Sequence, residues 1–103
     1  MMRIEAVIAL LGDLHPPELI SWVERGWVQP DSAGNVWEFR EIDVARVRLI
    51  RELRHDMALG EEAMPVVLSL LDQVYDLRGA LKRIAGALEA QPPEVRAAVI
   101  EAL

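Results

Sequence analysis

Apolar residues return every three or four positions in the first part of the chain, which is the spacing of a buried helical face. Residues 4–11 predict a short helix that ends at Gly12, and residues 16–25 predict a second helix that ends at Gly26. Proline suits the first turn of the second helix, because the N–H that it lacks has no helical partner there. A tight turn of residues 12–15 joins the two helices. The second helix is predicted to turn inward Leu19, Ile20 and Val23.

Two short apolar or aromatic stretches follow, residues 27–30 and 36–39, and they flank a run of turn-forming residues at 31–35. This order predicts a small two-stranded hairpin, with Trp37 and Phe39 on one face. A lone hairpin is only marginally stable in water, so its aromatic face is expected to pack against the helices. Trp37 is therefore predicted to be a core residue.

The second half of the chain again follows a helical pattern. A third helix is predicted from about Ile42 to Met57 and a long fourth helix from about Glu61 to Ala90, with Glu61 and Glu62 in its first turn, where acidic residues are favoured. Prolines at 92 and 93 end the fourth helix, and residues 94–103 predict a short terminal one. The third helix is predicted to bury one side and expose the other, with Ile42, Leu49, Ile50, Leu53 and Met57 inside and Arg48, Arg51 and His55 outside.

The fourth helix contains a heptad repeat. Its a and d positions are apolar over about three repeats, which is typical of a helix that pairs with another helix. The e and g positions are mostly small, so charge does not indicate the orientation of such a pair. We expect this stripe to be the seam of a homodimer, and burial within the chain is the alternative. The predicted seam consists of Val67, Leu70, Val74, Leu77, Leu81, Ile84 and Leu88.

Composition narrows the class of protein. A chain of 103 residues suits one compact domain, which we divide into residues 1–60, the long helix 61–90 and the terminal helix 91–103. The absence of cysteine excludes disulfides and thiolate metal sites and is compatible with a cytoplasmic protein. No apolar run approaches the ~18 residues of a membrane-spanning helix, and the start of the chain lacks an export signal.

Catalysis finds little support in the residues. His15 and His55 lie in different predicted elements without a spaced carboxylate partner, and no phosphate-binding glycine loop or nucleophile elbow occurs. The pair Asp72 and Asp76 lies one helical turn apart and is more simply explained as a solvated face than as a cation site. We therefore predict neither enzymatic activity nor a cofactor nor a metal site.

Helix, tight turn, helix and hairpin together form the order of a winged helix-turn-helix, which makes DNA binding the obvious hypothesis. The second helix would then enter the major groove and should offer cations to the phosphates. From Pro16 to Arg40 the chain instead has four acidic and two basic residues, and its formal net charge is −6. This charge favours a basic protein partner over nucleic acid. Trp22, on the flank of the second helix, is the aromatic residue expected to contribute to such a contact.

Several segments, in their order and spacing, resemble the CbpM-type chaperone-modulator family, a relative of the MerR-like winged-helix proteins. The resemblance covers roughly residues 3–90, and the last dozen residues lie outside it. The matching segments are Gly26-Trp27-Val28-Gln29-Pro30, Trp37-Glu38-Phe39, the run from Arg48 to Leu59 and the run from Val67 to Val74.

The resemblance implies a mainly α protein with a MerR-like winged helix-turn-helix, a small β-hairpin wing and a long C-terminal helix. It also implies a partner, the J-domain of a DnaJ-like co-chaperone of the CbpA type, whose co-chaperone and DNA-binding activities the protein would inhibit. Acidic and aromatic surface groups are the candidate contacts, namely Glu18, Trp22, Asp72 and Asp76. The alternative is a MerR-like transcriptional regulator that binds DNA directly.

Overall fold

The computed structural model describes residues 1–103 and divides into two compact units, Met1–Pro65 and Val66–Leu103. The division falls in the first turn of the long helix, a few residues after the boundary predicted at residue 60. That the three predicted regions form one domain stays a prediction. The elements along the chain are α1 (Ile4–Leu11), α2 (Pro16–Glu24), β1 (Asp31–Ala33), β2 (Val36–Glu38), α3 (Glu41–Arg51), the π-helical turn η1 (Glu52–Asp56), α4 (Met64–Glu89) and α5 (Pro93–Ala102).

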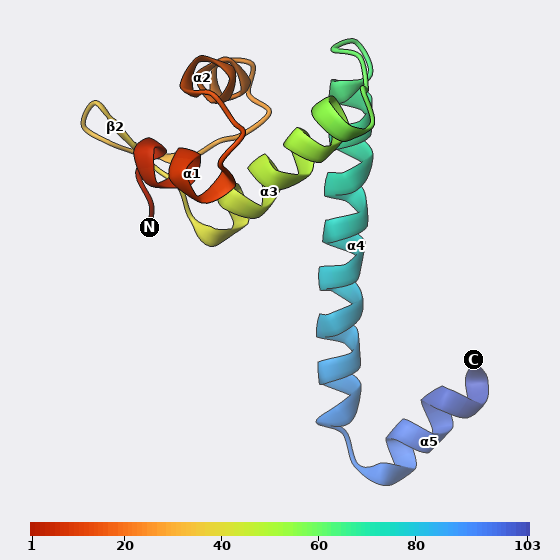
Figure 1. Cartoon of the computed structure of the whole chain (residues 1–103). Coiled ribbons are helices and arrows are strands. Elements are labelled where there is room, and N and C mark those ends of the chain that lie inside the picture. Colours follow the sequence, from red (N-terminus) through yellow and green to blue (C-terminus); the bar gives the residue numbers. More distant parts are fainter. The chain divides into compact units, whose positions relative to one another are not determined.

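In the N-terminal unit, α1 and α2 form the predicted helix-turn-helix beside α3 (Figure 1). Gly12 ends α1 with a positive φ of 71°, and its N–H donates to the carbonyl of Ile8. The turn is also fastened from α3, because Arg51 Nη1 donates to the carbonyl oxygen of Leu11 at 2.9 Å and to Asp13 Oδ1 at 3.1 Å. Prolines fill the first turn of α2 as the sequence predicts.

The hairpin is confirmed, but its first strand lies elsewhere than predicted. Asp31 pairs with Glu38 and Ala33 with Val36, so the turn is reduced to two residues, and the first strand occupies residues predicted as turn. Gly34 supplies the positive φ of 66° that a two-residue connection needs. Trp27 and Val28, which were predicted as strand, are instead buried core residues of an irregular segment. Trp37 is only half-buried.

The third predicted helix is confirmed as α3 followed without a break by η1, but its buried side is wrong by about a quarter turn. Ile42 is 46% exposed and Met57 is 67% exposed. The buried stripe is built around Val47 and includes a charged residue, Asp43, which the hydrophobic pattern counts as outward-facing. The buried positions of this run are Asp43, Val44, Val47, Ile50 and Leu53.

Asp43 is buried because it caps α3. Its carboxylate accepts from the backbone N–H of Arg40 at 2.9 Å and from the Arg40 guanidinium at 3.0 and 3.2 Å. Hydrogen bonding to Asp43, then the charges of Asp43 and Asp31, raise the pKa of Arg40 above its usual value. The carboxylate of Asp43 therefore has hydrogen-bond partners, although the residue is buried in the core of the N-terminal unit.

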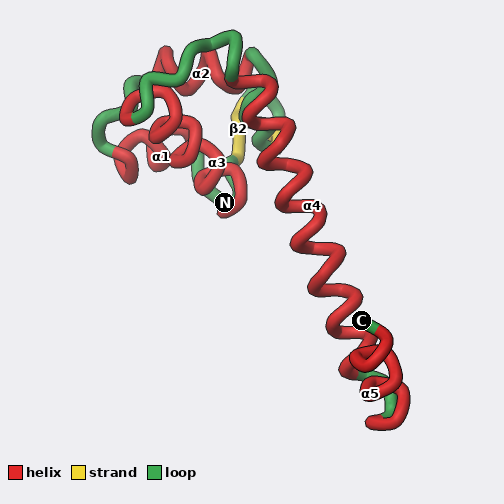
Figure 2. Tube along the Cα trace, turned by 90° about the vertical axis from the view of Figure 1, so that its right-hand side faces the viewer, coloured by secondary structure: helices red, strands yellow, loops and turns green.

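The long helix α4 begins at Met64, later than predicted. Glu61 and Glu62 lie in the preceding turn, because Pro65 has no N–H to donate and its ring excludes a further helical turn on its N-terminal side. From there α4 is one uninterrupted helix to Glu89, followed by a short connection and α5 (Figure 2). The predicted terminal helix is thus confirmed.

The heptad stripe lies on one side of α4, and its five central positions are 43–65% exposed within the chain. Val67 and Leu88, at its two ends, are half-buried. The C-terminal unit itself therefore does not cover these central positions. Pairing with a second copy and burial within the chain both stay predictions.

Substituting Asp43→Ala tests the cap of α3. We expect the free energy of unfolding to fall by about 1–3 kcal/mol, since a capping acceptor is lost and the N–H of Arg40 becomes unsatisfied. Glu41→Ala, an exposed acid in the same helical turn, is the matched control and should cost less than about 0.5 kcal/mol. Equal urea midpoints for the two variants would contradict this role of Asp43.

Candidate functional site

The outward side of α2 is acidic. No lysine or arginine occurs between Pro16 and Glu24, whereas Glu18 is half-buried and Glu24 is exposed. In a helix-turn-helix this is the helix that would face a nucleic acid groove. The local charge is therefore unfavourable for phosphate contact.

Glu18 also contacts the neighbouring turn η1. Its Oε1 lies 2.7 Å from Nε2 of His55, which projects from η1. The expectation that His55 has no carboxylate partner is wrong, because the fold brings together two residues far apart in the chain. The His55 ring lies 6.4 Å from the Trp22 ring, centre to centre, at an interplanar angle of 57°. Thus α2 and η1 form one continuous surface.

A second acid, Glu61, neutralises the arginines nearest to α2. Its carboxylate lies 3.0 Å from Nη1 of Arg25 and 3.8 Å from Nη2 of Arg54. The Arg25 guanidinium also lies 5.2 Å from the centre of the Trp27 ring, a cation–π distance. These two cations are consequently engaged inside the unit.

These groups border an open groove of about 260 Å³ beside α2, which we term the α2 groove. Its lining includes two tryptophans together with acidic and basic groups. A concave surface with aromatic groups and fixed charges fits a protein side chain better than a duplex backbone. The groove is lined by Pro17, Glu18, Ser21, Trp22, Arg25, Trp27, Arg54 and Glu61.

Most other arginines of the N-terminal unit are also held by their own chain. Arg46 Nε donates to the carbonyl of Trp27, and Arg51 and Arg40 make the contacts described above. The side chains of Arg3 and Arg48 are exposed and form neither a hydrogen bond nor an ion pair. With seven arginines against twelve acids, the unit offers few cations to a ligand.

The candidate residues fall into two groups. Glu18 and Trp22 meet at the α2 groove, but Trp22 is only 3% exposed, so the expectation that it lies at the surface is wrong. Trp22 is therefore a core residue, of which only a small part is exposed at the α2 groove. Asp72 and Asp76 lie exposed on α4 in the C-terminal unit.

Sequence reasoning missed Glu61 and His55 as members of this surface. Neither has a local signal, since each reaches α2 through the tertiary fold. Glu24 could have been found, because it lies on the same predicted helix as Glu18.

The chain contains no group of three or more histidines, cysteines or acids arranged to hold a metal ion. None of its helices combines the length and the apolar character needed to cross a membrane.

Comparison with known proteins gives two matches. The family model described as MerR HTH family regulatory protein matches residues 4–85. A Streptomyces coelicolor protein described as putative heat shock protein HspR is 27% identical over 92 residues, which are 88% of this chain and 61% of that relative. The chain therefore spans less than two thirds of that relative's length. No solved structure matches significantly.

The burial of Trp22 has a measurable consequence. We expect Trp22→Ala to lower the free energy of unfolding by about 3–5 kcal/mol, as for other large-to-small changes in a core. Tyr75→Ala, at an aromatic residue 63% exposed on α4, should change it by less than about 0.5 kcal/mol. Urea unfolding followed by circular dichroism compares the two, and an unchanged midpoint for Trp22→Ala would show that its ring is not part of the core.

Proposed function

Because the chain belongs to the MerR helix-turn-helix family of regulatory proteins, we propose that it regulates by binding a protein. The proposed partner is the J-domain of a DnaJ-like, CbpA-type co-chaperone, whose co-chaperone and DNA-binding activities it inhibits. The observation that carries this proposal is the acidic outward side of α2, where the family fold would otherwise read DNA. The family is regulatory, and the proposed role requires no catalysis.

Charge supports a basic protein as the partner. A helix that enters the major groove approaches two rows of phosphates and needs cations beside it. Glu18 and Glu24 would instead be repelled, and Arg25 and Arg54 are already paired with Glu61. Complementary charge of the opposite sign would steer a basic surface to the same place.

The J-domain is the basic surface that the CbpM-type resemblance implies. The heat-shock name of the Streptomyces coelicolor relative agrees with this class of partner in broad terms. Inhibition then follows from occlusion, because a J-domain bound at the α2 groove has its basic surface covered. Asp72 and Asp76 are further candidate contacts, and a cytoplasmic location is part of the proposal.

Charge reversal on α2 tests the proposal. Titration calorimetry of the chain against the J-domain should show binding that weakens about tenfold or more for Glu18→Lys combined with Glu24→Lys. Glu101→Lys, an exposed acid in α5, is the control and should bind like the wild type. Absence of heat with the wild type, together with absence of competition against the DnaK-type chaperone, would overturn the proposal.

Direct DNA binding is the second candidate, and the unpartnered cations Arg3 and Arg48 favour it. A gel shift on duplex DNA distinguishes the two candidates. Under the first proposal, the free chain shows only weak binding. A strong shift that falls steeply with salt and is lost in Arg3→Ala with Arg48→Ala would support the DNA-binding regulator.

We also propose that the exposed heptad stripe of α4 pairs with a second copy. Seven apolar positions in one row resemble half of a coiled-coil interface, and the same row on another copy is its natural complement. Association would remove the large exposed side chains from water.

A single charge in the stripe tests this pairing. Sedimentation at micromolar concentration and about 0.5 M salt should give twice the monomer mass of 11.6 kDa for the wild type. Leu81→Glu should sediment as a monomer, because a charge in an apolar seam loses its hydration. Lys82→Glu, at the neighbouring outward position, should remain a dimer. A wild-type chain that sediments as a monomer would contradict the proposed seam.

A further inference from the structure

The hairpin has a free backbone edge beside the start of α1. The N–H of Phe39 donates to the carbonyl of Met2 at 2.6 Å, and the N–H of Met2 donates to the carbonyl of Phe39 at 2.8 Å. Backbone groups of every second residue in a strand point to the same side, so Trp37 also turns its N–H and C=O away from β1. The bridge to Met2 is isolated, because the chain enters α1 at Ile4. The N–H and C=O of Trp37 are thus left without a backbone partner on this edge.

An open groove of about 340 Å³ lies beside this edge, and we call it the edge groove. Its walls are residues 3–5 at the start of α1, residues 35–37 of the hairpin and Ile20 of α2. Positions two apart on a helix point to nearly opposite sides, so Ile20 lies away from Glu18 and the α2 groove. The two grooves share no lining residue. The edge groove is therefore a separate surface of the N-terminal unit.

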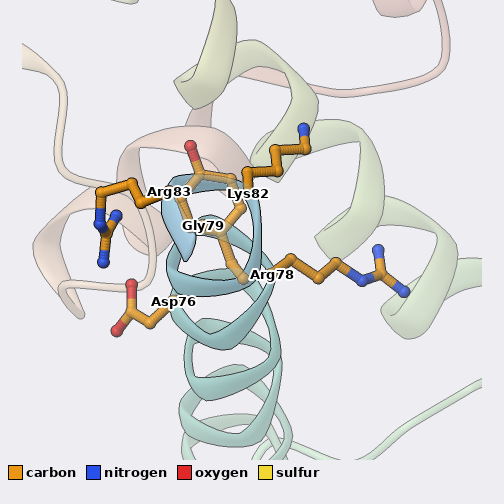
Figure 3. A pocket seen from close by; sticks show the side chains of 6 residues that line it. Asp76, Arg78, Gly79, Lys82 and Arg83 are labelled. Atoms are coloured by element: carbon orange, nitrogen blue, oxygen red, sulfur yellow. The ribbon is translucent and has the colours of Figure 1, made fainter. Parts of the chain in front are cut away.

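A hollow on α4 has a larger volume but a different construction. It measures about 480 Å³, and all of its lining residues come from one helix. Figure 3 shows Arg78 and Lys82 extending to one side of this helix and Asp76 and Arg83 to the other. A single helix does not surround a ligand, whereas the edge groove has walls from three elements.

We propose that the edge groove binds an extended segment of a partner protein, which adds to β2 as an antiparallel strand, the orientation that Met2 already has. The backbone of such a segment supplies the donor and the acceptor that Trp37 lacks. The groove is apolar at four positions, Ile4, Ile20, Val36 and Trp37. An apolar side chain opposite Trp37 would pack there as a cross-strand neighbour. This site is independent of the one proposed for the J-domain.

Charge in the lining indicates the rest of the segment. Arg3 and Glu5 are the two charged residues of the edge groove, and their exposed side chains form neither an ion pair nor a hydrogen bond. A segment with an acid on one side of its apolar residue and a base on the other complements both. A nucleic acid strand carries only negative phosphates, which Glu5 would repel. The lining therefore favours a peptide of mixed charge.

Two capped pentapeptides probe the site, Thr-Glu-Ile-Lys-Thr and Thr-Lys-Ile-Glu-Thr. In an NMR titration of the labelled chain, the amide of Trp37 should shift with the peptide, and one order of charges should bind about threefold more tightly than the other. The amides of Glu18 and His55 should stay unshifted. Absence of a Trp37 shift with both peptides would overturn the proposal. So would a Trp37 shift that needs only a higher concentration of the chain, or only single-stranded DNA, because the occupant would then be a second copy or a nucleic acid.

Methylation of the peptide backbone tests the strand pairing. The N–H groups of neighbouring residues in a strand point to opposite sides. N-methylation of the central isoleucine, which faces the carbonyl of Trp37, should weaken binding about tenfold or more. N-methylation of the lysine beside it is the matched control and should leave binding within about twofold, because that N–H faces away from β2. Equal effects of the two methyl groups would contradict strand addition.

A charge exchange in the chain tests the choice of occupant. Arg3→Glu combined with Glu5→Arg keeps the net charge and reverses the order of charge along the edge groove. We expect this variant to prefer the peptide that the wild type binds more weakly, while its circular dichroism spectrum stays that of the wild type. If the preference between the two peptides does not invert, Arg3 and Glu5 do not select the segment and a peptide of mixed charge is the wrong occupant.

Discussion

The structure of the N-terminal unit depends on arginines that are bound by their own chain. Arg51 fastens the turn between α1 and α2, Arg46 holds the carbonyl of Trp27, and Arg40 closes the cap of α3 with Asp43. Each contact uses a cation to stabilise backbone or a buried acid, so that cation is not presented to a ligand. The outward side of α2 is left with Glu18 and Glu24. A fold suited to phosphate contact thereby presents an acidic surface.

In the C-terminal unit the main feature is exposed apolar surface. Its long helix has an apolar stripe whose five central positions are exposed. Association through such a stripe would persist in salt, because it depends on the burial of apolar surface.

Local patterns predicted much of this fold. The helices, the turn at Gly12, the presence of a hairpin and the heptad stripe all depend on spacing, capping and turn residues, which act over a few positions. The errors arise where tertiary contacts decide. Asp43 is buried, so the buried side of α3 differs from the side that the apolar residues predict. Trp22, which was expected at the surface, is part of the core. The contacts of Glu18 with His55 and of Glu61 with Arg25 join distant segments, so no spacing rule could show them.

The central claim is that the acidic surface along α2 binds a basic protein surface. An NMR titration of the labelled chain with the J-domain of a CbpA-type co-chaperone follows every backbone amide at once. The account predicts that the largest shifts cluster on α2 and η1, around Glu18, Glu24 and His55, and that duplex DNA at the same concentration leaves these amides unshifted. Shifts of the α2 amides with DNA, together with none on adding the J-domain, would contradict it.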